Sequence, residues 1–175
     1  RQLDELCREA KNLGLITTVT TNGLLYPKYA ERLKGLIDML HLSLDSPDEE
    51  EHNKSRGVKC FDKVMESIKI AKSLGERPDI IFTVFEDNID KIGRVYDEIC
   101  VPNNLVLILN PVFEYKSVGQ NLSNEALAEL RRWGKAKNVY LKQAISVKNR
   151  EEDFTIMPKG LNKQKRMTIS NCNKK

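Results

Sequence analysis

The sequence predicts an α/β protein built on a parallel sheet, and three observations support this. Segments of strand length alternate with segments of helical periodicity along residues 1–145. Two strand segments, at 80–85 and 105–109, are apolar on both faces, as is typical of strands buried between helices. The order is one helix, three strand–helix units and a further strand. Such an order favours right-handed crossovers, in either a Rossmann-like sheet or a barrel.

The first half of the chain shows helix, strand, short helix and strand in turn. Leu3, Leu6 and Cys7 begin a helical spacing that stops at Gly14. A stretch rich in β-branched residues then ends at the turn signal Asn22-Gly23. The expected elements are a helix over 2–13, a strand over 15–21, a helix over 27–33, a strand over 37–44 and a charged loop over 46–59.

The second half repeats the alternation. An apolar helical face stops at Gly75, and Pro78 precedes the next strand. Asp87 or Asn88 can cap the helix that follows, and Pro111 should end the fourth strand because it cannot donate to a ladder. The expected elements are a helix over 61–74, a strand over 79–85, a helix over 88–100, a strand over 105–109, a loop over 112–122, a helix over 123–137 capped by Ser123, and a strand over 139–144.

Length and composition limit the domain count and the class of protein. With 175 residues and 40% hydrophobic content, the chain suits one domain, which we assign to 1–145; residues 146–175 read as a loop or disordered C-terminal extension. The net charge is +4, and Lys159–Lys175 holds six basic residues and no acidic one. A solvated tail is the commoner explanation of such a segment, so nucleic acid binding is not expected. Neither a membrane span nor a signal peptide is recognisable, and we expect a cytoplasmic protein.

Polar residues gather where the expected strands end. In the second strand, Leu40, Leu42 and Leu44 share one face, while His41, Ser43 and Asp45 share the other with Met39. A polar line toward the carboxyl end of a buried strand indicates a lined cavity. Each residue alone could be a turn former, a cap or a filler; four strands ending this way favour a cleft. The strand-end residues are Asn22, Ser43, Asp45, Thr83 and Asn110.

Several classes of chemistry are not favoured. No glycine-rich phosphate loop and no GxSxG occurs, which argues against dehydrogenases, phosphotransferases and hydrolases. His41 lies deep in its strand and is better explained as a satisfied interior histidine than as a base or ligand, and His52 as a solvated loop residue. The cysteines, Cys7, Cys60, Cys100 and Cys172, are too far apart for a zinc or cluster motif, and we expect Cys7 and Cys100 to be buried thiols.

As a series, several segments resemble the radical S-adenosylmethionine enzymes, especially the peptide-modifying and heme-biosynthesis branches. In that family TNG closes the third strand of a partial (βα)6 TIM-like barrel, SLDG closes the fourth, and an HDxxRG-type segment follows. Here Ser46 stands in place of the usual glycine and Asn53 in place of the aspartate. The matching segments are TTNG at 20–23, HLSLDS at 41–46, EEHNKSRG at 50–57, CFDKVMESIKIAK at 60–72, IIFTVFEDN at 80–88 and LILNPV at 107–112.

The resemblance implies S-adenosylmethionine and a [4Fe-4S] cluster as cofactors of the parent protein. The family's CxxxCxxC loop and GGEP segment precede the TNG strand and do not occur in this sequence. The implied protein is therefore a core-domain fragment of an iron–sulfur oxidoreductase or maturase-type enzyme. It would contribute part of the cofactor and substrate cleft and be inactive alone. Cys172 by itself is thin support for an auxiliary cluster.

The resemblance also assigns binding roles, although no catalytic residue. Ser43 would bind the methionyl carboxylate of S-adenosylmethionine, and Arg56 would pair with it, because a guanidinium fork matches a carboxylate. Asn22, Asp45, Thr83 and Asn110 would line the cofactor or substrate side of the cleft.

Two other functions stay open at this point. The chain could instead be another parallel α/β barrel, such as an aldolase. A catalytic lysine at a strand end would favour that interpretation, and none of the four strand ends has one. A non-enzymatic binding module would use the basic tail. The substrate, a peptide or small molecule, is not defined. If two barrel strands precede this sequence, the strand at 15–21 is an edge, and self-association through it is expected.

Overall fold

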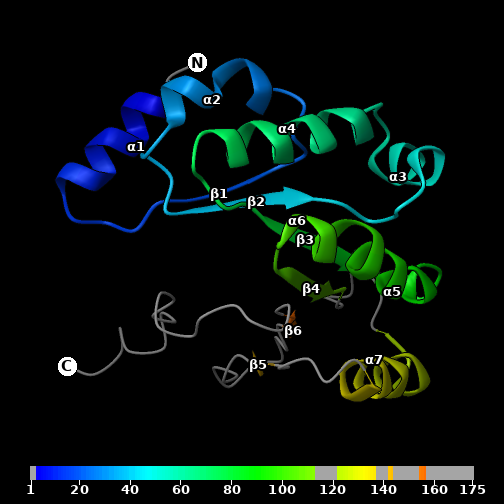
Figure 1. Cartoon of the computed structure of the whole chain (residues 1–175). Coiled ribbons are helices and arrows are strands. Elements are labelled where there is room, and N and C mark those ends of the chain that lie inside the picture. Colours follow the sequence, from blue (N-terminus) through cyan, green and yellow to red (C-terminus); the bar gives the residue numbers. More distant parts are fainter. Residues whose placement is uncertain (1–2, 113–121, 137–141, 144–153, 157–175) are drawn as a thin grey trace, which may run out of the picture.

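The computed structural model describes residues 3–112, 122–136, 142–143 and 154–156. They form a sheet in the order β1-β2-β3-β4-β6-β5, and helices connect the parallel strands along the chain (Figure 1). The strands are β1 (Thr18–Thr21), β2 (Met39–Ser43), β3 (Asp79–Val84), β4 (Leu107–Pro111), β5 (Lys142–Gln143) and β6 (Phe154–Ile156). The helices are α1 (Leu3–Asn12), α2 (Tyr26–Leu33), α3 (Glu49–Arg56), α4 (Phe61–Ser73) and α7 (Asn124–Ala136), with a continuous helical stretch of η1 (Ile89–Lys91), α5 (Ile92–Arg94), η2 (Val95–Cys100) and α6 (Val101–Asn103).

The parallel sheet predicted from the sequence is confirmed. Strands β1 to β4 are adjacent in chain order, and each neighbouring pair is parallel. Beyond β4 the sheet changes direction, because β6 is antiparallel to β4 and β5 is antiparallel to β6. Strand β6 lies within 146–175, where a loop was expected. Most of that extension, including the basic tail and Cys172, lies outside the described residues.

The boundaries of β1 to β4 differ from the prediction by up to three residues, and two of these differences have a clear structural reason. Strand β1 begins at Thr18 instead of 15, because β2 starts opposite it at Met39 and the Asp38 carboxylate accepts the N–H of Thr17 at 2.8 Å. Strand β4 continues through Pro111, which pairs with Val84. The pairing of β4 with β6 stops before Pro111, so its missing N–H removes no ladder bond.

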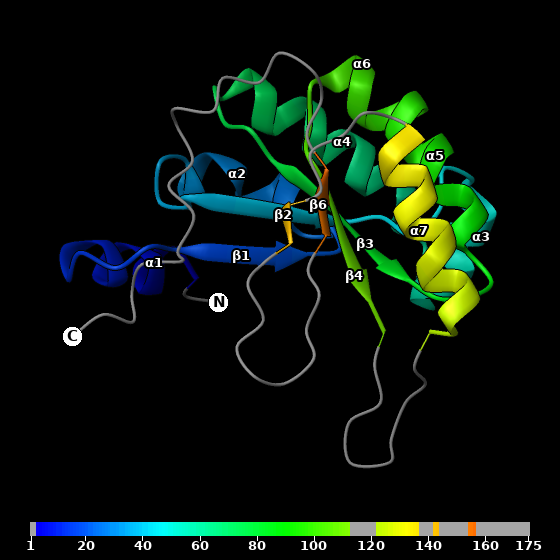
Figure 2. The same cartoon turned by 90° about the horizontal axis from the view of Figure 1, so that it is seen from below.

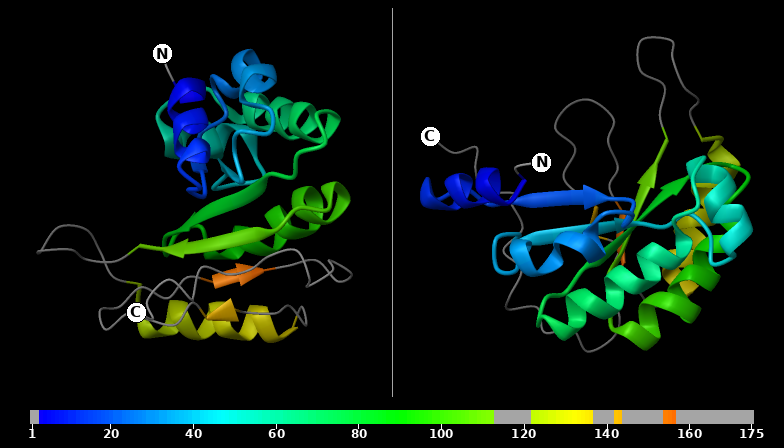
Figure 3. Two further views of the ribbon diagram at one scale, coloured as in Figure 1. Left: turned by 90° about the vertical axis from the view of Figure 1, so that its left-hand side faces the viewer. Right: turned by 90° about the horizontal axis from the view of Figure 1, so that it is seen from above.

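The main hydrophobic core lies on one face of the sheet. Leu42, Ile80, Phe82 and Leu107 project from the strands and pack with apolar residues of α4, η2 and α7. Figure 2 and the right view of Figure 3 show α2, α4 and α5 on this same side. Because side chains alternate along a strand, the neighbours of these residues point to the opposite side, which we call the inner face. Its residues are more polar and include Thr20, His41, Ser43, Thr83 and Asn110.

A glycine allows α4 to approach the end of β1. Gly23 has φ +75°, and a Cβ at this position would lie 3.0 Å from the Cα of Val64. The hydroxyl of Ser67 also donates to the carbonyl of Gly23 at 3.2 Å. The turn that follows β1 is therefore held directly against α4, next to the carboxyl ends of the strands.

The segment 46–59 is the clearest correction, because it contains α3 where a loop was expected. Its first turn carries three glutamates and its last turn Lys54 and Arg56, an arrangement that complements the helix dipole. Gly57 ends the helix in the left-handed conformation, at φ 66°. In the part of the chain that the structure describes, no helix is long and apolar enough to cross a membrane.

Candidate cofactor-binding site

The carboxyl ends of β2 and β3 bring Ser43, Asp45, Arg56 and Thr83 into one region. Ser43 is the last residue of β2 and Asp45 follows two residues later on the same face, and both are buried. The helix α3 returns over this end and places Arg56 at its last position. Ligands in open parallel sheets bind at this end of the strands.

The carboxylate of Asp45 is the centre of the polar contacts here. Its Oδ1 accepts from Arg56 Nη2 at 2.7 Å and from the backbone N–H of Thr83 at 3.1 Å, and its Oδ2 accepts from Ser55 Oγ at 3.4 Å. The side chain of Asp45 is only 3% exposed. A buried carboxylate needs such partners, because burial without them is costly. Asp45 therefore ties the end of α3 to β3.

Arg56 has one buried donor without a partner among the described residues. Its Nε is buried and makes no hydrogen bond with any described residue, although its Nη2 is bonded to Asp45. The side chain as a whole is 23% exposed, so the guanidinium lies at the border between protein and solvent. An unsatisfied buried donor is unfavourable, and an oxygen from a ligand or water would satisfy it. The orphaned Nε–H therefore fits an anionic oxygen.

His52 is fully buried, which corrects the expectation of a solvated loop residue. Its Nδ1 accepts from the backbone N–H of Asp45 at 3.2 Å, and its Nε2 lies 3.4 Å from Cys60 Sγ. Burial is the main cause that lowers the pKa of His52 to about 4. The imidazole is therefore neutral at pH 7, and its bond to the backbone of Asp45 ties α3 to the end of β2.

Asn53 shows that the substitution in the HDxxRG-like segment is compatible with its geometry. The side-chain Oδ1 accepts the N–H groups of Cys60 at 2.7 Å and Phe61 at 3.0 Å, at the start of α4. A neutral amide oxygen is sufficient for this contact, as a carboxylate oxygen would be. Asn53 and His52 were both missed as site-forming residues. The one available signal was their position between acidic and basic clusters, which marks a short helix.

The remaining predicted residues occupy the flanking strand ends. Asn22 accepts from the N–H of Leu24 at 3.2 Å, as a turn former does. Asn110 is exposed on β4, in register with Thr83 of β3. Thr83 contributes its backbone N–H to Asp45. The structure thus groups Ser43, Asp45, Arg56 and Thr83, with Asn22 and Asn110 at the neighbouring ends; their roles toward a ligand stay predictions.

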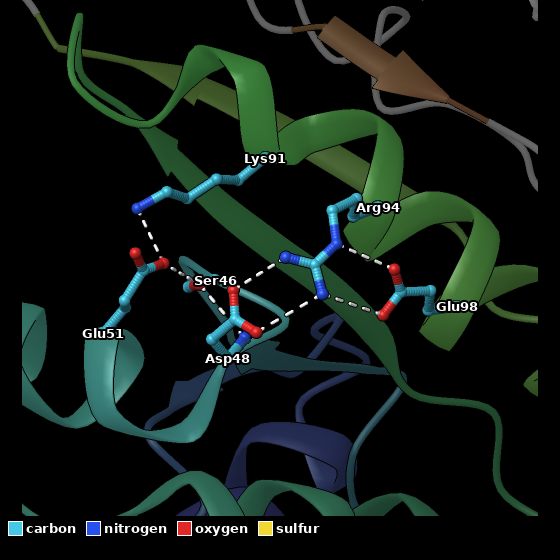
Figure 4. A network of polar contacts seen from close by, with 6 residues as sticks. All are labelled: Ser46, Asp48, Glu51, Lys91, Arg94 and Glu98. Carbon is cyan, nitrogen blue, oxygen red and sulfur yellow. Dashed lines mark hydrogen bonds and ion pairs between the residues drawn. The ribbon is translucent and has the colours of Figure 1, made fainter.

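An ion-pair network fastens α3 to the helical stretch after β3 (Figure 4). Arg94 contacts Asp48 through Nη1 at 2.8 Å and Glu98 through Nε at 2.8 Å. Lys91 contacts Glu51 at 2.7 Å, and Ser46 donates to the same Glu51 oxygen at 2.8 Å (Figure 4). Ser46 is buried and Lys91 is 22% exposed, whereas the four other side chains are about half exposed, so each ion pair contributes little by itself. Together they anchor the N-terminal part of α3 to this helical stretch.

The cysteines of the described residues are on separate elements. Cys7, Cys60 and Cys100 are buried and unpaired, and burial raises the pKa of each thiol. The expectation of buried thiols at Cys7 and Cys100 is confirmed. Within the described ranges, no group of three or more His, Cys, Asp or Glu side chains could hold a metal ion.

Comparison with known proteins gives sequence relatives that match about half of the chain. Probable GTP 3',8-cyclase of Sulfurisphaera tokodaii is 35% identical over 98 residues, which are 54% of this chain and 31% of the relative. The protein of the same name from Saccharolobus islandicus is 40% identical over 97 residues, covering 54% and 32%. The chain therefore spans about a third of the length of these curated relatives.

Solved structures share the fold. The structure of TYW1 with a lysine-pyruvate adduct bound aligns with a TM-score of 0.62 at 20% identity, over 89% of this chain and 51% of that one. Streptococcus suis SuiB bound to S-adenosylmethionine aligns with a TM-score of 0.57 at 24% identity, over 76% and 32%. The sequence profile of the radical SAM superfamily matches residues 1–99. This chain belongs to the radical SAM superfamily.

Proposed function

We propose that this chain forms part of the S-adenosylmethionine and substrate cleft of an iron–sulfur enzyme of the oxidoreductase or maturase type. Membership of the radical SAM superfamily implies S-adenosylmethionine and a [4Fe-4S] cluster in the parent protein. When bound, this pair supplies one-electron reduction and a radical that abstracts hydrogen from a substrate. The residues of this chain bind and orient the cofactor.

The observation that carries the proposal is the unpartnered Nε–H of Arg56 at the strand ends. The methionyl carboxylate of S-adenosylmethionine would place one oxygen on this donor, while Asp45 keeps the guanidinium in position through Nη2. Ser43 lies on the inner face, two residues before Asp45, and offers a hydroxyl donor. Thr83 and Asn110, in register at the ends of β3 and β4, would border the substrate side.

We propose that this chain does not supply the cluster ligands, because no group of three or more metal-binding side chains was found among the described residues. The three described cysteines are buried on separate elements, whereas cluster ligation needs closely grouped thiolates. We therefore propose that this chain is inactive by itself. Iron and sulfide added to the isolated chain should leave it colourless, and a stoichiometric four-iron cluster would contradict this assignment.

A second, narrower candidate is a reaction on a purine nucleotide. It is favoured by relatives at 35% and 40% identity that carry the name probable GTP 3',8-cyclase. The parent protein, supplied with reductant, S-adenosylmethionine and GTP, should then consume GTP. Cleavage of S-adenosylmethionine with GTP left intact would reject this substrate and retain the broader proposal.

The broader proposal is tested by calorimetric titration of S-adenosylmethionine into a longer protein that includes the cluster loop. Arg56→Ala should weaken binding about ten-fold or more, because a charged hydrogen bond contributes about 1.5–3 kcal/mol. Ser43→Ala should cost about 1 kcal/mol, as expected for a neutral donor. Lys54→Ala, exposed in the same helix, is the charge control. If Lys54→Ala weakens binding as much as Arg56→Ala, the assigned role of Arg56 is wrong.

A further inference from the structure

Three side chains from three adjacent strands form a row across the inner face, below the strand ends. The register pairs Thr20 of β1 with His41 of β2, and His41 with Asp79 of β3. The neighbouring residues Leu42 and Ile80 belong to the core against α4, so His41 and Asp79 point to the opposite side. Parallel pairing thus places a hydroxyl, an imidazole and a carboxylate side by side.

Thr20 and Asp79 each lie beside a different imidazole nitrogen of His41. Thr20 Oγ1 lies 3.4 Å from His41 Nδ1, and Asp79 Oδ2 lies 3.7 Å from His41 Nε2. Exposure rises along the row: the side chain of Asp79 is 1% exposed and that of His41 13%, and Thr20 is exposed. The carboxylate is therefore the buried end, and the hydroxyl is the end that faces solvent.

This order matches the chemistry of an acid–base relay. A carboxylate beside one imidazole nitrogen fixes the tautomer and stabilises the imidazolium, which leaves the other nitrogen to accept a proton. The inner-face neighbours of His41 on its own strand, Met39 and Ser43, do not carry a charge at neutral pH, and Thr20 on β1 is uncharged. On β3 the facing residues are Asp79, which is ionisable, and Ile81. Asp79 is thus the charged neighbour that the adjoining strands supply on this face.

The row lies close to the proposed cofactor region without being part of it. His41 precedes Ser43 by two residues on the same face of β2, a separation of about 7 Å along a strand. A substrate bound against the strand ends would therefore reach the exposed hydroxyl of Thr20. Among the described residues, the hydrogen bonds of Asp45 and Arg56 involve none of these three side chains.

We propose that Thr20, His41 and Asp79 form a proton relay for a substrate hydroxyl or ammonium group. The hydroxyl of Thr20 accepts the proton of the substrate O–H or N–H bond while it passes its own proton to His41 Nδ1. The substrate atom keeps the electron pair, and the imidazolium that forms is stabilised by the carboxylate of Asp79. The reverse transfer returns the proton. This inference rests on the proposed function only in taking the inner face as the face where the substrate binds.

The titration of His41 in the full 175-residue chain tests the relay. The sequence has two histidines, so nitrogen-15 NMR of the imidazoles gives two sets of signals, which His41→Gln assigns. Neutral His41 should carry its proton on Nε2. Its pKa should fall by about 1–3 units in Asp79→Asn, because an opposite charge within a few ångströms favours the charged form. Asp62→Asn, at an exposed position on α4, is the matched charge control and should leave the titration unchanged.

A second measurement separates a relay from an ion pair that is only structural. The rate of proton exchange between His41 Nδ1 and water should fall several-fold in Thr20→Val and recover in Thr20→Ser, since serine restores the hydroxyl. A neutral tautomer with the proton on Nδ1, a pKa that ignores Asp79→Asn, or equal exchange in Thr20→Val would each overturn the proposal. None of these readouts depends on S-adenosylmethionine, so the relay and the proposed function can fail separately.

Discussion

Removing the carboxylate of Asp45 should destabilise the whole domain, because this one side chain joins α3 to β3. Asp45→Ala deletes the acceptor for Arg56 Nη2 and leaves the N–H of Thr83 without its partner. A charged hydrogen bond contributes about 1.5–3 kcal/mol and an unpaired buried N–H costs about 1–3 kcal/mol. Because Arg56 is 23% exposed, water recovers part of this loss. We expect a net decrease of about 2–4 kcal/mol in the free energy of unfolding.

A second substitution separates shape from charge. Both Arg56 and Thr83 donate to the same atom, Oδ1, so Asp45→Asn can keep both contacts with a neutral acceptor. Its cost should be about half that of Asp45→Ala, since charge-assisted bonds are roughly twice as strong as neutral ones. Urea unfolding of the 175-residue chain followed by circular dichroism measures both values. Asp62→Ala, at an exposed position on α4, should stay within about 0.5 kcal/mol of the original protein.

The double variant Asp45→Ala/Arg56→Ala completes a cycle. If the pair is coupled as the 2.7 Å contact indicates, Asp45→Ala should cost at least about 1 kcal/mol less when Arg56 is already alanine. A cost of Asp45→Ala below about 1 kcal/mol, or the same cost in both backgrounds, would refute the reasoning.

Three further predictions concern other parts of the molecule. Folding lowers the pKa of His52 from 6.5 to about 4, so the unfolded chain binds the proton more tightly than the folded one. The stability contributed by neutral His52 is therefore full above pH 6.5 and falls by up to about 3 kcal/mol toward pH 4. In urea titrations at several pH values, His52→Asn should flatten this pH dependence. Gly23→Ala should lower the free energy of unfolding by about 3 kcal/mol, because its Cβ would meet Val64 at 3.0 Å. Gly35→Ala, at φ +72° with open space around it, should lower it by about 1 kcal/mol. Equal losses in thermal or urea unfolding would contradict the close approach. The chain should self-associate through the β1 edge and the exposed Leu13, 75% exposed, and light scattering that shows a monomer at high concentration would contradict this.

Periodicity was sufficient to predict the parallel part of the fold. The strands β2 and β3 have apolar residues at alternate positions that enter the core, and the helices between them have continuous apolar faces. These signals are strong because burial on one face constrains every second or every third to fourth residue. Antiparallel β6 was not predicted, since three residues in a polar segment give no usable period, and its place is set by pairing with β4.

The grouping of polar residues at the strand ends was predicted in part. Ser43, Asp45 and Thr83 were located because strand ends can be read from the sequence. The burial of His52 was not predictable from its charged neighbours, since it depends on α3 folding back over the end of β2, a contact made through the backbone of Asp45. Likewise, the sequence could not show that Arg56 would already be paired with Asp45.

The most direct test of the central claim is the side-chain Nε–H signal of Arg56, followed by NMR during titration of S-adenosylmethionine into the longer protein that includes the cluster loop. The account predicts that this signal shifts, together with the amides of Ser43 and Thr83, because the methionyl carboxylate binds the donor that lacks a partner. Decarboxylated S-adenosylmethionine should leave the Arg56 signal in place. An Arg56 signal that does not respond to S-adenosylmethionine, or that responds equally to both compounds, would contradict the account.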